Sequence, residues 1–156
     1  MTPSTPVENS PEPAGLSSRK VAIPLLALLG IELVLGIVLD AFVNLPSGAS
    51  VVAVLSTQWA LDFHIVVAVL LIGLSGHAVI SAGREPTRRP RLAAVLALLS
   101  ALVASAGGWE FVFNGQNPAF AGVMTLGFVG VLIGAVLLRV WGSRGTSPGE
   151  LPRAAA

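Results

Sequence analysis

The sequence predicts an all-α polytopic membrane protein, a bundle of four transmembrane helices. Hydrophobic residues make up 54% of the 156 residues and charged residues only 11%, whereas about a quarter of a typical soluble domain is charged. Four apolar stretches each have about the 20 residues that a helix needs to cross a bilayer. Since the bilayer core offers no water to satisfy backbone groups, these stretches are expected to be helical. A membrane β-barrel would need alternating segments of about 10 residues, and the sequence contains none.

The chain divides into a tail, a membrane domain and a second tail. Residues 1–18 are rich in Pro, Ser, Thr and Glu and are predicted to be a disordered tail. The membrane domain is expected over residues 19–142, and residues 143–156 form a short second tail. The four spans are predicted, in order, at residues 21–43, 60–82, 92–113 and 120–141.

Each span has the composition of a transmembrane helix. The first carries fifteen Val, Ile, Leu and Phe residues, which outweigh the insertion cost of a central acid. The other three are runs of Leu, Val, Ala and Ile that are too long for ordinary buried strands. Trp59, Trp109 and Trp141 fall at predicted span ends, where an aromatic belt would place them.

The basic residues predict the orientation of the spans. All nine Lys and Arg residues lie before the first span, between the second and third, or at and beyond the end of the fourth. The two remaining loops, residues 45–59 and 114–119, contain none. By the positive-inside rule, both termini are expected in the cytoplasm and the protein in the inner (plasma) membrane.

Glu32 is the most unusual residue of the first span. It lies eleven residues above the inner end, roughly 16 Å at about 1.5 Å per residue, and therefore near the midplane. Because an ionised carboxylate there costs about 2.5–3.5 kcal/mol, Glu32 is expected to face the other helices in a neutral, hydrogen-bonded form. Positions 32, 36, 40 and 44 follow one side of the helix, and Gly36 is expected to let a neighbouring backbone approach.

A group of polar residues from three spans is predicted at the outer level. The group consists of Asp40, Asp62, His64, Glu110 and Asn114. It would form a polar mouth for an ion, a proton or a small ligand, or it would simply reach headgroups and water at little cost. Both interpretations stay open. Glycines Gly127, Gly130 and Gly134 of the fourth span predict close helix packing.

The two histidines raise the question of a b-type haem. His64 and His77 are thirteen residues apart, which is about 20 Å along one helix, so they cannot bind one haem together. A homodimer or a pairing of His64 with Met124 would be needed. Asp40, Asp62 and Glu110 could join His64 as metal ligands, but no metal motif is present. No cofactor and no metal are therefore expected, and haem b is kept as an alternative.

Several stretches resemble a family of small four-span membrane proteins of actinobacteria that has no assigned function. They are "ELVLGIVLDAFVNLP", His64 ahead of a long apolar run, and "FNGQNPAFAGVMTLGF". Glu32, Gly36 and the "FNG" turn match the family pattern, whereas Asp40 stands where an Asn is expected. The resemblance covers most of residues 25–140 and implies the four-span fold and its topology, without a mechanism.

The chain is not expected to be an enzyme, because it has no cysteine and no Ser/His/Asp or metalloprotease spacing. The first functional prediction is a non-enzymatic bundle or accessory subunit with a buried polar stripe. The alternatives are a proton- or ion-coupled protein that uses Glu32, and a haem or quinone redox protein. Expected partners are the lipid bilayer and further membrane subunits or a second copy. Nucleic acid is not expected, because no basic and aromatic residues interleave.

Overall fold

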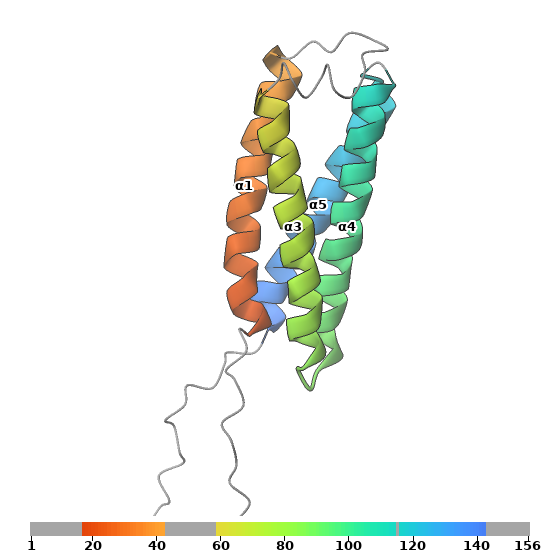
Figure 1. Ribbon diagram of the computed structural model, residues 1–156. Helices are drawn as coiled ribbons and strands as arrows, with labels where there is room; N and C mark the ends of the chain where they lie inside the picture. The colour runs from red at the N-terminus through yellow and green to blue at the C-terminus, as the bar shows by residue number, and fades with distance from the viewer. Residues whose placement is uncertain (1–16, 43–58, 115, 143–156) are drawn as a thin grey trace, which may run out of the picture.

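The computed structural model describes residues 17–42, 59–114 and 116–142, and these form four helices (Figure 1). The helices are α1 (Ser18–Phe42), α3 (Trp59–Gly83), α4 (Arg88–Phe113) and α5 (Pro118–Trp141). They alternate in direction, so the start of α1 and the end of α5 lie at the same end of the bundle. Each helix is long and apolar enough to cross a membrane. The prediction of an all-α protein with four such helices is confirmed.

The helix bounds agree with the predicted spans to within a few residues. The largest difference is at α4, which begins at Arg88, four residues before the predicted position 92. Pro90 does not prevent this start, because a proline in the first helical turn removes an N–H that has no partner in any case. The two predicted tails lie outside the described residues except for Ser17 and Ser18. Ser18, the last residue of the predicted first tail, is helical and buried.

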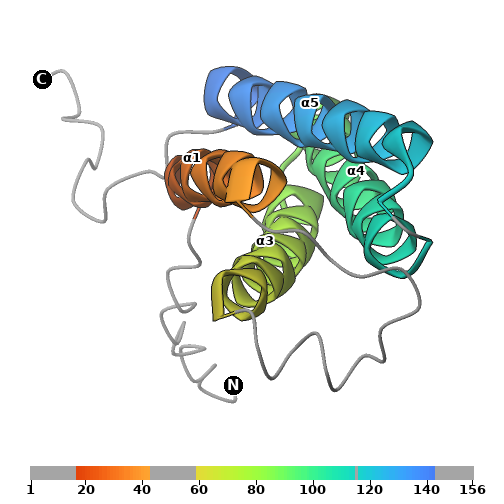
Figure 2. The same cartoon turned by 90° about the horizontal axis from the view of Figure 1, so that it is seen from above.

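Seen along the bundle, the four helices form a ring (Figure 2). Helix α1 packs on α3 and α5, and α4 completes the ring by packing on the same two helices. The closest of these contacts joins α4 and α5, which are neighbours in the sequence. Asn117 caps the start of α5: its side-chain oxygen accepts a hydrogen bond of 3.0 Å from the backbone N–H of Ala119.

Small residues bring α4 and α5 together. A Cβ on Gly127 would lie only 2.7 Å from the backbone nitrogen and Cβ of Ala104 and from the carbonyl oxygen of Ser100. A Cβ on Gly134 would lie 2.8 Å from the backbone nitrogen and Cβ of Ala97. These separations leave no room for a methyl group, so the predicted close packing at the glycines of this helix is confirmed.

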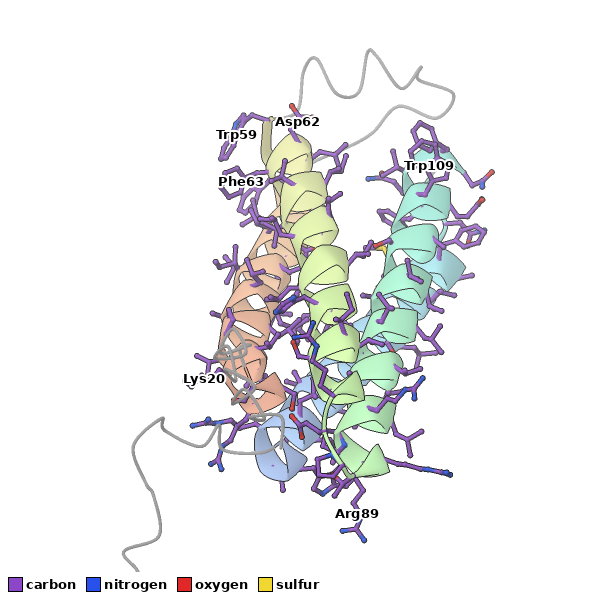
Figure 3. The ribbon with its side chains drawn as sticks, turned by 60° about the horizontal axis from the view of Figure 1, so that its bottom comes forward. Lys20, Trp59, Asp62, Phe63, Arg89 and Trp109 are labelled. Carbon is purple, nitrogen blue, oxygen red and sulfur yellow. The ribbon has the colours of Figure 1, made fainter. Side chains whose placement is uncertain are left out.

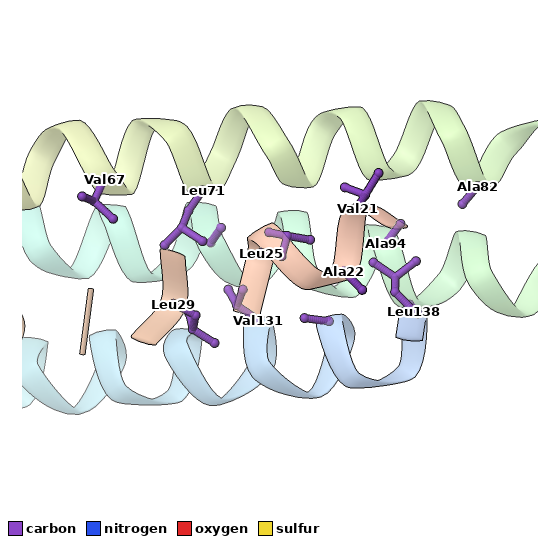
Figure 4. Close-up of a cluster of buried hydrophobic side chains, with 14 residues drawn as sticks. Val21, Ala22, Leu25, Leu29, Val67, Leu71, Ala82, Ala94, Val131 and Leu138 are labelled. Atoms are coloured by element: carbon purple, nitrogen blue, oxygen red, sulfur yellow. The ribbon is translucent and has the colours of Figure 1, made fainter. Parts of the chain in front are cut away.

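The buried core lies mainly in the half of the bundle that contains the start of α1 and the end of α5 (Figure 4). In α1 the core residues are Val21, Ala22, Leu25 and Leu29. Among the described residues of α1, none after Leu29 is buried. The other half of α1 therefore has looser surroundings, and Glu32 begins that half.

A polar contact closes the end of the bundle at which α1 starts. The backbone N–H and the hydroxyl of Ser18 both donate to Glu85 Oε1, over 3.3 Å and 2.5 Å. Gly142, directly after α5, packs so closely that a Cβ would lie 2.7 Å from the Ser18 hydroxyl oxygen and the Arg19 nitrogen. No sequence motif predicts the hydrogen bonds between Ser18 and Glu85. Together with the packing of Gly142, they join the start of α1, the α3–α4 connection and the end of α5.

Candidate functional site

The central polar contact joins Glu32 of α1 to His64 of α3. Glu32 Oε1 lies 3.3 Å from His64 Nδ1 across the interface of the two helices. The side chains are 11% and 17% exposed, respectively, so both are largely enclosed without being sealed. The prediction that Glu32 faces other helices is confirmed, and the residue that it faces is ionisable.

The contact is close but incomplete as a hydrogen bond. The distance between Oε1 and Nδ1 is short enough for a hydrogen bond, but His64 Nδ1 and Glu32 Oε2 are both buried without a hydrogen-bond partner among the described residues. Leaving a buried polar atom unpaired costs about 1–3 kcal/mol. The pair therefore has unused capacity to hold a proton or to accept a donor.

The predicted depths of these two residues are wrong relative to each other. The sequence predicts His64 at the outer level and Glu32 alone near the midplane, but the two side chains are in contact. That prediction requires the ends of the two spans to be level. In the structure, α1 continues for ten residues after Glu32 to Phe42, whereas α3 starts five residues before His64 at Trp59. The ends of the two helices are therefore staggered.

Three other members of the predicted outer group, Asp62, Glu110 and Asn114, do not join this pair. Asn114 donates through Nδ2 to Glu110 Oε2 one turn away on α4, and both side chains are exposed. Asp62 lies half-buried in the first turn of α3, and the side chain of Asp40 lies outside the described part of the structure. Residues 17–42, 59–114 and 116–142 contain no cluster of three or more His, Cys, Asp or Glu side chains that could hold a metal.

Gly36 does not have the predicted role in close packing. It lies one turn beyond Glu32, on the same side of α1 and farther along the helix from the buried core. No described atom comes within 4 Å of the position that a Cβ would take there. The space beside Gly36 is consistent with the absence of buried residues after Leu29 among the described part of α1.

The residues considered for haem ligation are held in separate places. His77 is exposed, and its Nε2 lies 3.4 Å from the hydroxyl oxygen of Ser81 on the same helix. The Met124 sulfur packs against α4, 3.8 Å from the position of a Cβ on Gly108. The ring of His64 instead meets a carboxyl group of α1. The pairing of His64 with Met124 gains no support from these contacts.

Comparison with known proteins returned no relative. No family model matches the chain, and neither a curated protein nor a solved structure matches it. The resemblance noted in the sequence therefore remains a prediction, and the case for a function depends on the contact between Glu32 and His64.

Proposed function

We propose that the chain is a multi-pass protein of the inner (plasma) membrane in which Glu32 and His64 bind and release a proton. In this proposal both termini lie in the cytoplasm. The support for this orientation is that Lys20 and Arg89 lie at one end of the bundle, while Trp59, Asp62 and Trp109 lie at the other (Figure 3). The basic end is also the end at which α1 starts and α5 finishes, as the positive-inside rule requires of cytoplasmic termini.

The single observation that carries the proposal is the approach of Glu32 Oε1 to His64 Nδ1 at 3.3 Å inside the bundle. With Glu32 ionised and His64 neutral, the pair carries one negative charge. One added proton makes the pair neutral overall, whether the carboxyl or the imidazole holds it. Because charge in a membrane interior is costly, proton binding changes the energy of the contact between α1 and α3.

A purely structural role for the pair is the competing function. A structural contact is normally satisfied, since the large majority of buried polar atoms have a hydrogen-bond partner. Here both His64 Nδ1 and Glu32 Oε2 lack one among the described residues, and neither side chain is completely enclosed. These two features favour a site that exchanges a proton over a fixed hydrogen bond.

The proposal is tested by pH-difference infrared spectroscopy on the protein in liposomes, together with proton flux measured by a pH-sensitive dye in the lumen. The wild type is expected to show the signal of a carboxyl group that gains and loses a proton. Glu32→Gln removes this group but keeps its size and hydrogen-bonding capacity. The variant is expected to lose the carboxyl signal and to reduce proton flux to the level of liposomes without protein.

Glu110→Gln is the matched control, because Glu110 is an exposed acid whose described hydrogen bond is to Asn114 of its own helix. It should keep the flux of the wild type. If Glu32→Gln keeps both the carboxyl signal and the flux of the wild type, or if the wild type shows neither a carboxyl signal nor more flux than empty liposomes, the pair has a structural role and the proposal is wrong.

A further inference from the structure

A surface cavity lies at the basic end of α4. It has a volume of about 330 Å³ and is lined by Arg88, Arg91, Leu92 and Val95. All four lining residues belong to α4, so the cavity is open on the side away from the helix. The spacing of the four residues puts them on one face of the helix. Two arginines therefore share a cavity with two apolar side chains, with the arginines nearer the end of the helix.

The arginine half of this cavity is suited to an anion. No acidic residue lies in the first turn of α4, and Thr87 does not cap the helix with its side chain. The first N–H groups of the helix therefore add positive potential to that of the two guanidinium groups. In the described part of the chain, no acid forms an ion pair with Arg88 or Arg91. Guanidinium groups bind phosphate oxygens in pairs of parallel hydrogen bonds.

The other half of the cavity is suited to a hydrocarbon chain. Leu92 is 66% exposed, and the same face of α4 continues toward the middle of the helix with Leu99, 57% exposed, and Leu102, 46% exposed. No described helix covers these side chains. A ligand that fills both halves has an anionic group at the helix end and an apolar chain along the helix. A phospholipid has both parts.

We propose that this cavity binds the headgroup of an anionic phospholipid of the leaflet at the basic end, with an acyl chain along Leu92, Val95 and Leu99. The site differs from general attraction between basic residues and anionic lipid. Arg84 and Arg89 are exposed near the same end and do not line the cavity. The proposal does not depend on proton binding by Glu32 and His64.

The test compares two double variants with the same change in net charge. Delipidated protein in detergent is titrated with phosphatidylglycerol or phosphatidylcholine, and lipid adducts are counted by native mass spectrometry. At about 1 kcal/mol for each basic residue, R88Q/R91Q should weaken phosphatidylglycerol binding by about 30-fold. The matched control R84Q/R89Q should change it by less than about threefold, because neither side chain lines the cavity. Phosphatidylcholine should bind weakly to all three proteins.

Three results would overturn the proposal. An equal loss in the two double variants would mean that any arginine at this end attracts anionic lipid. Equal binding of the two lipids by the wild type would remove the requirement for an anion. Displacement of phosphatidylglycerol by an equimolar amount of inorganic phosphate would mean that the apolar half contributes nothing. If R88Q/R91Q does not fold, the single variants R88Q and R91Q replace it, each with an expected loss of about fivefold.

Discussion

Glu32 and His64 have buried polar atoms that need hydrogen-bond partners, and the two side chains meet this need only in part. The separation of 3.3 Å between Oε1 and Nδ1 makes them energetically dependent, because either residue alone would leave the other enclosed without a partner. Removing one member of such a pair is therefore more harmful than removing both. This asymmetry gives a way to measure the contact through stability, independently of proton movement.

We expect Glu32→Leu and His64→Leu each to lower the free energy of unfolding. The double variant should lose less than the sum of the two single losses. His64→Leu leaves the Glu32 carboxyl without its neighbour, at a cost of about 1–3 kcal/mol, while the double variant removes both polar groups. The coupling energy in a double-mutant cycle should be about 0.5–3 kcal/mol. It is measured from thermal or denaturant unfolding in detergent, followed by circular dichroism.

His77→Leu is the control for this cycle. His77 is exposed, and its described contact is with Ser81 of the same helix, so its removal should change the free energy of unfolding by less than about 0.5 kcal/mol. Additive effects of Glu32→Leu and His64→Leu would show that the two side chains are not coupled.

The sequence predicts that Glu32 and His64 are unusual residues of their spans, but not how they meet. Glu32 and His64 stand out because ionisable residues within a span are expensive and therefore rare. Their contact depends on the stagger between α1 and α3, which hydropathy does not encode. Hydropathy marks where a span begins and ends to within a few residues, and an error of one turn moves a side chain by about 5.4 Å.

At the scale of helices, the contact between α4 and α5 depends on glycines of α5 that leave no room for a methyl group. Gly127→Ala would put a methyl group about 2.7 Å from the Ala104 backbone and from the Ser100 carbonyl oxygen, and neither can move without shifting α4. We expect this change to lower the free energy of unfolding by about 1–3 kcal/mol. Unfolding in detergent, followed by circular dichroism, measures the loss.

Gly36→Ala is the matched control, because the same chemical change is made where no described atom lies within 4 Å. It should be neutral or should stabilise the helix by about 0.5–1 kcal/mol, since alanine has a higher helix propensity than glycine. Equal effects of the two substitutions would mean that α4 and α5 do not pack as closely as described.

These glycines also show where sequence reasoning reaches its limit for an element. Gly36 lies four residues from Glu32, and Gly130 lies four residues from Gly134, so both positions have the spacing of a packed helix face. Of these, only Gly130 and Gly134 have atoms of a neighbouring helix within contact distance. The length and apolar character of each helix follow from local composition, but the face that meets a neighbour depends on the whole ring.

Across the whole molecule, packing is uneven along the bundle axis. The core and the contacts of Ser18 with Glu85 lie toward the basic end, while the described part of α1 has no buried residue beyond Leu29. Segments with few buried apolar contacts open at lower free energy than the core. Glu32 and His64 therefore lie at the border between a well-packed half and a looser one, where a proton could reach them without global unfolding.

The orientation of the whole molecule can be tested with single cysteines, because the native chain contains none. Arg84→Cys marks the basic end, and Ala119→Cys, at the exposed first turn of α5, marks the opposite end. Since the positive-inside rule puts the basic end in the cytoplasm, a membrane-impermeant maleimide should label Ala119→Cys in intact cells. It should label Arg84→Cys only after the cells are permeabilised. The reverse pattern would place both termini outside, and it would also move the lipid site of α4 to the outer leaflet.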